Sequence, residues 1–126
     1  MLKLITLLRR RPDLSTAAFR SYYEARHARI ADKYMNGRAT RYVRRYLSPV
    51  TNPLTGETAP PAFDVLTEVW FADQATFDAT MMVFASPEVA AEIANDEEHL
   101  FDRAKSLLFT EDDEHESQLQ AVRESG

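Results

Sequence analysis

The chain contains no cysteine and only three glycines and three histidines among its 126 residues. Without cysteine it can form neither a disulfide framework nor a thiolate metal site, and this composition suits a reducing compartment. The sequence has no glycine-rich phosphate loop and no pair of histidines at helical spacing. We therefore expect no nucleotide cofactor and no metal.

Long apolar runs and an excess of basic charge are also missing. No apolar stretch approaches the ~20 residues that a membrane-spanning helix needs. The apolar run at the N-terminus is too short for a signal peptide and ends in Arg9–Arg11. The net charge is −5, whereas a nucleic-acid binder needs a basic face. We expect a cytoplasmic protein that binds neither membranes nor nucleic acids.

The residues that are present suffice for one folded domain. Hydrophobic residues make up 44% of the chain and include seven Phe, five Tyr and one Trp. We expect this domain to span residues 1–110, followed by an acidic tail over 111–126 that is either disordered or an arm docked on a partner. Arg9–Arg11 and the cluster at Arg41, Arg44 and Arg45 are interpreted as solvated strand ends or as inter-subunit ion-pair partners of this tail.

Hydrophobic periodicity and turn residues predict a β-α-β-β-α-β order, which is the ferredoxin-like α+β plan. We expect a four-stranded antiparallel sheet with helices on one face and a second helical segment that is split in two. Ser15 or Asp13 is expected to cap the first helix and Asp73 the next. The expected strands are 2–8, 40–47, 62–71 and 105–110, and the expected helices are 16–34, 74–84 and one that begins at Pro87.

The sheet presents apolar side chains on both faces. The first expected strand carries Leu2, Leu4 and Leu8 on one side and Ile5 and Leu7 on the other. A strand that is apolar on both sides must be covered on both sides. Because no further strands remain in the chain, we expect a homodimer in which two sheets pack face to face.

The first expected helix carries an aromatic stripe with one imidazole in it. Phe19, Tyr23, His27, Ile30 and Tyr34 fall within an arc of roughly 80° at helical spacing. His27 can move a proton near neutral pH, and Tyr23 can donate a hydrogen bond to a developing oxyanion. The structural alternative is a core histidine that is satisfied by a single partner.

The third expected strand adds two candidate catalytic carboxylates, Asp64 and Glu68, on the same face as Trp70. Either carboxylate can fix the imidazole tautomer or act as a second acid/base group. The structural alternative for Asp64 is a turn cap at the strand entry. For Glu68 it is an ion pair with Arg44 or Arg45.

Large apolar side chains are the candidates for binding a flat, hydrophobic ring. At helical and strand spacing the same residues fit an ordinary core, and both interpretations stay open. These candidates are Phe19, Tyr22, Tyr42, Trp70, Phe77, Met81, Phe84 and Phe101.

Three spaced motifs resemble those of the EthD family. They are Phe19-x-x-Tyr22-Tyr23-x-x-x-His27, Phe63-Asp64-x-x-x-Glu68-x-Trp70-Phe71, and Ala85-Ser86-Pro87-Glu88 followed by Asp96-Glu97 and Phe101-Asp102. The resemblance spans residues 2–110 and implies membership of the dimeric α+β barrel superfamily.

This resemblance implies a small, cofactor-free enzyme that acts on an aromatic or polyketide-like compound. Decarboxylases, dehydratases, cyclases and monooxygenases occur among such proteins, and their pockets lie between helices and sheet. His27 is then the general acid/base, with Asp64 and Glu68 as the strand acids. A pattern of haem iron ligands is missing. The alternative function is a non-catalytic, dimeric small-molecule-binding or accessory protein of a catabolic operon. A pocket beside His27 favours the enzyme, and a filled core favours the accessory protein.

Overall fold

The predicted order of elements is confirmed. The structure is a computed structural model that describes residues 1–122. The strands are β1 (Leu2–Leu8), β2 (Arg41–Tyr46), β3 (Val65–Phe71) and β4 (Leu107–Thr110). The helices are α1 (Thr16–Tyr22), the π-helix η1 (Tyr23–His27), α2 (Ala28–Met35), α3 (Gln74–Ala85), α4 (Pro87–Glu97) and the 3₁₀-helix η2 (Arg103–Lys105).

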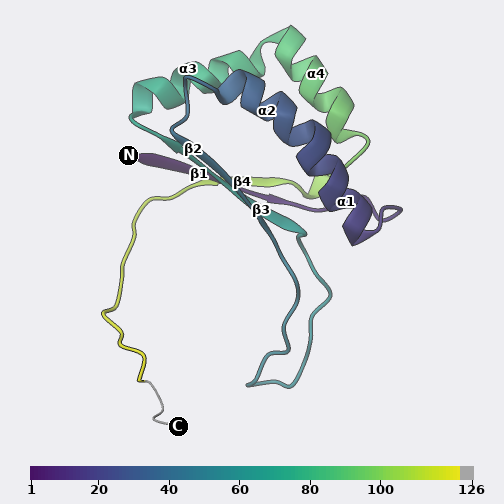
Figure 1. The fold of residues 1–126 in the computed structure, drawn as a ribbon, viewed down its shortest axis with the longest axis vertical. Helices are drawn as coiled ribbons and strands as arrows, with labels where there is room; N and C mark the ends of the chain where they lie inside the picture. Colours follow the sequence, from purple (N-terminus) through teal and green to yellow (C-terminus); the bar gives the residue numbers. More distant parts are fainter. Residues whose placement is uncertain (123–126) are drawn as a thin grey trace.

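The four strands form one antiparallel sheet in the order β2-β3-β1-β4. Figure 1 shows that the helices lie together on one side of this sheet. The chain therefore has the ferredoxin-like α+β fold.

The first helical segment runs without a break from Thr16 to Met35 but contains a π turn. Ser15 caps its start by accepting a hydrogen bond of 3.0 Å from the backbone N–H of Ala18. Within η1 the backbone N–H of Ala28 donates to the carbonyl of Tyr23, a wider turn than in an α-helix. The segment ends before Gly37, whose φ of +81° is the left-handed conformation that glycine adopts readily.

The second helical segment is split in two, as predicted. Asp73 caps α3 by accepting a hydrogen bond of 2.8 Å from the backbone N–H of Thr76. Ser86 separates α3 from α4, and Pro87 occupies the first turn of α4, where no backbone donor is needed.

The core lies between the helices and the sheet. Phe19, Tyr23 and Leu100 from the helical layer are almost fully buried against Val65 and Phe101. A second cluster, formed by Met35, Val69 and Phe71, lies beside the first. Because strand residues alternate between faces, the residues of β3 that point into this core are those with odd numbers.

The opposite face of the sheet, which we call the outer face, carries Glu68 at its centre. Lys3 pairs with Glu68 at 2.9 Å, and Arg45 contacts the same carboxylate from β2. No helix among residues 1–122 covers this face, and Figure 1 shows the β2–β3 loop and the C-terminal segment projecting on that side.

Three predicted strands begin later than expected, β2 by a single residue and the other two by more. β3 starts at Val65 instead of Ala62, because the backbone N–H of Asp64 bonds to Leu8 and its carboxylate is held by Arg10. β4 starts at Leu107 instead of Lys105, because η2 occupies the residues before it. Residues 111–122 contain no helix or strand, and residues 123–126 of the expected tail lie outside the described part of the chain.

Candidate functional site

A cavity of about 360 Å³ lies between the helices and the sheet. Leu4, Thr6, Thr67 and Val69 form its floor on β1 and β3, and most of its surface is apolar. The helical layer contributes most of the remaining walls: Tyr23, His27, Ala31, Met35, Met81, Phe84, Ala90, Ile93 and Ala94. A cavity of this size and lining suits a small hydrophobic ligand.

One histidine lines this cavity, and a buried carboxylate holds it. The Nδ1 atom of His27 lies 2.9 Å from Oδ2 of Asp96 on α4, and both side chains are buried. A carboxylate only accepts hydrogen bonds, so Nδ1 donates to Asp96, and Nε2 of the neutral imidazole then has a lone pair. No residue among 1–122 forms a hydrogen bond with Nε2, which leaves this atom for a ligand.

The second oxygen of Asp96 is also occupied. The Tyr22 hydroxyl donates to Oδ1 of Asp96 at 2.6 Å. Burial and the neighbouring Asp96 raise the pKa of Tyr22, so this phenol stays a donor. Asp96 is therefore fixed from both sides, which in turn fixes the orientation of the imidazole.

A pair of phenols flanks the imidazole. The Tyr23 and Tyr42 hydroxyls lie 2.7 Å apart, and the Tyr23 ring meets His27 edge to face with 5.1 Å between centroids. Burial raises the pKa of Tyr42 to about 12, and burial together with Tyr42 raises the pKa of Tyr23 well above its usual value. Both phenols are neutral near pH 7, so one O–H of the pair remains free to donate.

Two further polar features mark the cavity wall. The Ser106 hydroxyl is buried and has no hydrogen-bond partner among residues 1–122. A buried hydroxyl without a partner is costly, so a ligand or a water molecule is expected to satisfy it. Glu97 and Arg103, which pair at 3.2 Å, line the cavity where Arg103 reaches solvent.

The prediction that Asp64 or Glu68 would hold the imidazole is wrong, because Asp96 occupies that place. Asp64 accepts hydrogen bonds from the Arg10 backbone at 2.9 Å and from its guanidinium at 3.2 Å. Glu68 pairs with Lys3 and Arg45 on the outer face. Neither carboxylate lines the cavity. The pair with Arg45 agrees with the structural interpretation of Glu68, whereas Asp64 binds Arg10 on a distant segment instead of capping a turn at the strand entry.

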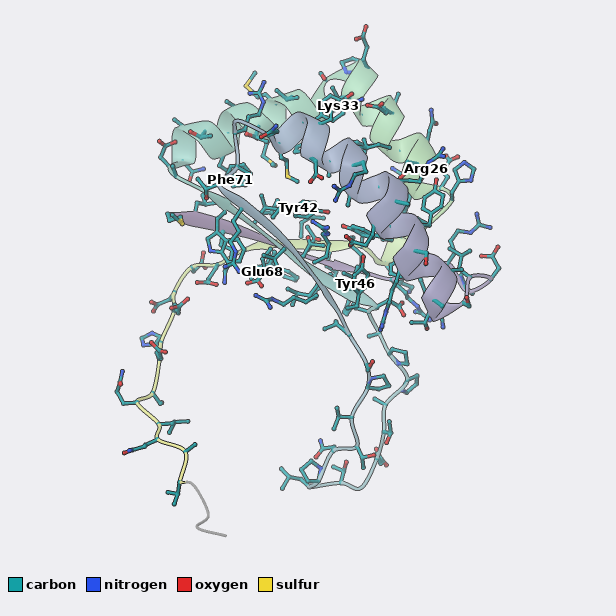
Figure 2. The ribbon with its side chains drawn as sticks, viewed as in Figure 1. Arg26, Lys33, Tyr42, Tyr46, Glu68 and Phe71 are labelled. Atoms are coloured by element: carbon teal, nitrogen blue, oxygen red, sulfur yellow. The ribbon has the colours of Figure 1, made fainter. Side chains whose placement is uncertain are left out.

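Four of the expected ring-binding residues, Tyr42, Met81, Phe84 and Phe101, line the cavity, whereas Phe19, Tyr22, Trp70 and Phe77 do not. Phe19 is fully buried in the core, and Phe77 packs edge to face against Phe71. Trp70 lies on the outer face, where Arg41 stacks on its ring. Tyr22 contacts the far side of Asp96. Figure 2 shows Tyr42 between the sheet and the helices, with Glu68 on the other side of the sheet.

The structure offers no metal centre in its described part, since residues 1–122 contain no group of three or more His, Asp or Glu placed to hold an ion. A search of the same residues for a helix long and apolar enough to cross a membrane finds none.

Comparisons with known proteins agree with this architecture. Three solved structures share the fold at low sequence identity. An EthD family protein from Bacillus halodurans C-125 is 19% identical with a TM-score of 0.60, and the match covers 90% of this chain and 99% of that one. An EthD-like protein from Ralstonia eutropha JMP134 is 17% identical with a TM-score of 0.58, over 87% and 89% of the two chains. A dimeric protein of unknown function and ferredoxin-like fold from Bacteroides fragilis is 17% identical with a TM-score of 0.51, over 87% and 93%.

No curated protein matches the chain. The family model described as the EthD domain matches residues 11–104, a stretch that contains the helical layer, His27 and Asp96. The chain therefore belongs to the EthD family.

Proposed function

We propose that this protein is a small, cofactor-free enzyme that acts on a hydrophobic, aromatic or polyketide-like molecule and uses His27 as a general acid/base. The observation that carries the proposal is the cavity of about 360 Å³, whose apolar walls lead to one imidazole held by a buried carboxylate. A plain core would have filled this space, because protein interiors contain few voids larger than a water molecule.

The chemistry follows from the tautomer of His27. With the proton on Nδ1 and directed to Asp96, Nε2 can take a proton from an acidic C–H or a phenol of the bound molecule. The imidazolium that forms lies beside the Asp96 carboxylate, and this opposite charge stabilises it. Delivered to a leaving hydroxyl, the same proton completes a dehydration with release of water, and delivered to the carbon that loses CO2 it completes a decarboxylation. In a cyclisation the enolate carbon attacks a carbonyl carbon and the proton goes to the carbonyl oxygen. Proton removal also makes an electron-rich ring reactive toward dioxygen, which would be the oxidant and the second substrate of an oxygenation.

The Tyr23–Tyr42 pair supports the same chemistry. Removal of a proton from carbon or from a phenol leaves negative charge on an oxygen of the substrate. A neutral, buried phenol is a strong donor to such an oxygen. Because the two hydroxyls bond to each other, their orientation is set before a ligand arrives.

The proposal includes a homodimer. On the outer face Leu107 and Phe109 are 44% and 50% exposed, next to Ile5 and Leu7 on β1. Apolar side chains on an uncovered sheet face favour a second sheet as their cover. The structural neighbour from Bacteroides fragilis is described as dimeric, which fits this interpretation.

The test is a turnover screen with a panel of aromatic ketones, naphthols and polyketide-like β-diketones. We expect the His27→Ala variant to lose at least about 100-fold in rate while keeping its fold, since general acid/base groups contribute ~10²–10⁴-fold. His99→Ala is the matched control, because His99 is exposed and does not line the cavity. Unchanged turnover by the His27→Ala variant would remove His27 from the mechanism.

The same screen addresses the alternative function, a non-catalytic binding or accessory protein of a catabolic operon. In that case members of the panel bind in the cavity and raise the melting temperature, but the wild-type protein converts none of them. The paired imidazole and the preformed phenol pair favour the enzyme, because binding a ring alone needs neither.

A further inference from the structure

Among residues 1–122, one cation on the outer face has no carboxylate partner. Lys3, Trp70 and Arg41 lie in one row across β1, β3 and β2. Lys3 pairs with Glu68 and Glu111, and Arg45 also contacts Glu68. The Arg41 guanidinium stacks on Trp70 with 4.7 Å to the ring centroid, and the described part of the chain offers it no ion pair. Positive charge is therefore left over at the β2 edge of the outer face.

The chain beyond β4 carries the opposite charge and leaves the sheet on the same face. The backbone N–H of Glu111 donates to the Lys3 carbonyl at 3.0 Å, and the Glu111 carboxylate lies 2.6 Å from the Lys3 ammonium. Residues 112–116 follow with four more carboxylates, all exposed. Within residues 1–122 only Asp113 among these four has an ion-pair partner, the exposed His115. Figure 1 shows this segment running away from the sheet on the side opposite the helices.

The cations and the carboxylates lie at opposite edges of the sheet, because β2 and β4 are the two edge strands. Two identical sheets can stack about a two-fold axis that runs along the strands or across them. An axis along the strands places β4 of one copy over β2 of the other. An axis across the strands places each β2 over its own equivalent.

Charge decides between these two arrangements. With the axis across the strands, the strand direction reverses, so Arg41 of one copy lies over the Tyr46 end of β2 in the other. The acidic segment after β4 then stays at the opposite edge of the sheet, away from Arg41 of both copies. With the axis along the strands, the acidic segment after β4 meets the β2 cations of the second copy. The loop between β2 and β3 projects on the same side, and its Val50 and Leu54 are more than four-fifths exposed and available to a partner.

We propose that the acidic segment Glu111–Glu116 of each subunit docks on β2 of a second copy of this chain, with Arg41 as its principal cation. This inference rests on the proposed homodimer and adds to it the direction of the two-fold axis and an exchanged ionic contact. The contact lies at the rim of the interface, so it sets register and salt dependence more than total affinity.

The test is a charge exchange between two subunits. One chain carries Arg41→Glu with its natural tail. The other keeps Arg41 and carries Asp112→Lys, Asp113→Lys, Glu114→Lys and Glu116→Lys. We expect each chain alone to dimerise about 5- to 10-fold more weakly than the wild type at low salt. In a mixture both contacts regain opposite charges, so native mass spectrometry should show the mixed dimer well above its statistical share. A chain that carries both changes should dimerise like the wild type and shows that the substitutions permit folding.

The possible outcomes distinguish a failure of tail docking from a failure of dimerisation. Statistical mixing of the two variants, with a stable wild-type dimer, overturns the docking of the tail and leaves the dimer intact. A wild-type protein that sediments as a monomer at low salt overturns both. Preferential mixed dimers that return to statistical proportions at 0.5 M NaCl, where the Debye length is roughly 4 Å, support the proposal.

Discussion

At the scale of single residues, the site depends on one buried carboxylate. Asp96 binds His27 through one oxygen and Tyr22 through the other. Burying a charge without partners is expensive, but two donors lower that cost and lock the side chain in place. The hydrogen bond from Nδ1 to Asp96 leaves Nε2 of His27 as the ring nitrogen that is available in the cavity.

Replacing Asp96 by Asn should disturb this tautomer. An amide can accept from Nδ1 or donate to it, so the imidazole is no longer restricted to the form with Nδ1 protonated. We expect the ¹⁵N chemical shifts of His27 near pH 8 to move from that single form toward a mixture of tautomers. We also expect a loss of about 1–3 kcal/mol in the free energy of unfolding.

Glu98→Gln is the control for this measurement, because Glu98 is exposed and lies just beyond α4. An unaltered ¹⁵N pattern in the Asp96→Asn variant would contradict the role assigned to Asp96.

The raised pKa of Tyr42 predicts that the folded protein loses stability at high pH. This pKa is raised to about 12, against about 10 in the unfolded chain. A raised pKa contributes stability that is complete below pH 10 and is lost as the pH rises through 12. We expect urea unfolding to show a smaller fall in stability between pH 10 and 12 for Tyr42→Phe than for the wild type, by about 2–3 kcal/mol. Equal falls in the two proteins would show that the pKa of Tyr42 is the same in the folded and the unfolded protein.

Sequence patterns predicted some of these residues and missed one. His27 and Tyr23 are found because helical spacing places both on a stripe that must face inward. Asp96 occurs on such a stripe too, since it follows Val89 and Ile93 at helical spacing and precedes Leu100. That stripe did signal an inward carboxylate. Its pairing with a histidine 69 positions away depends on how α4 packs against η1, which spacing within one helix does not encode.

At the scale of elements, a side-chain cluster joins the π turn to the sheet. Glu24 on η1 accepts hydrogen bonds from Arg44 and from the Tyr46 hydroxyl, both on β2. Figure 2 labels Tyr46, which lies below the first helical segment. This cluster therefore ties η1 to β2.

The Glu24 cluster should weaken in acid. The Arg44 guanidinium, aided by Tyr46 and opposed by burial, lowers the pKa of Glu24. A lowered pKa contributes stability that is present above the unfolded value near 4.3 and is lost as the pH falls through the folded value. Because Glu24 is partly exposed, we expect Glu24→Gln to cost only about 0.5–1 kcal/mol at pH 7 in urea unfolding. This difference should shrink as the pH falls below the unfolded value and vanish once Glu24 is protonated in the folded protein, and a cost that does not shrink in acid would point to packing instead of charge.

The sequence predicted the order, caps and several bounds of the elements, but it did not predict the π turn or the orientation of β3. The bounds of β1, both helix caps and the break at Ser86 follow from local chemistry, and each is confirmed. The π turn was not predictable, because residues four apart share a helix face with or without it. Alternation grouped Glu68 and Trp70 correctly on one face of β3, but Asp64 precedes the strand, and alternation does not tell which face meets the helices.

At the scale of the whole molecule, the two faces of the sheet differ in what covers them and in their charge. One side meets the helices and contains the cavity. The other combines the Lys3–Glu68–Arg45 cluster with apolar side chains that no helix among residues 1–122 covers. The need for cover was predictable from a strand that is apolar on both sides, and a pair of Glu68 with Arg44 or Arg45 was one of the two interpretations of that carboxylate. That Lys3 joins Glu68 and Arg45 became evident only once the register was known.

Phe109→Asp on the outer face should break the proposed dimer. A two-fold interface loses two phenyl rings and gains two carboxylates, so we expect the dissociation constant to rise by about 100-fold or more in sedimentation velocity experiments. The circular dichroism spectrum should not change, because the ring is half exposed within the subunit. Met82→Asp on α3 is the control, since Met82 is exposed in the helical layer. A Phe109→Asp dimer as tight as the wild type would place the interface elsewhere.

The central claim is that the cavity beside His27 receives a hydrophobic ring and presents it to Nε2. The most direct measurement is a titration of ¹⁵N-histidine-labelled protein with a panel of planar phenols and β-diketones, followed by nuclear magnetic resonance. We predict that at least one member shifts Nε2 of His27 saturably while His99 and His115 stay unchanged. If every ligand leaves His27 unmoved, or if all three histidines shift together without saturation, the cavity is not a binding site for such molecules.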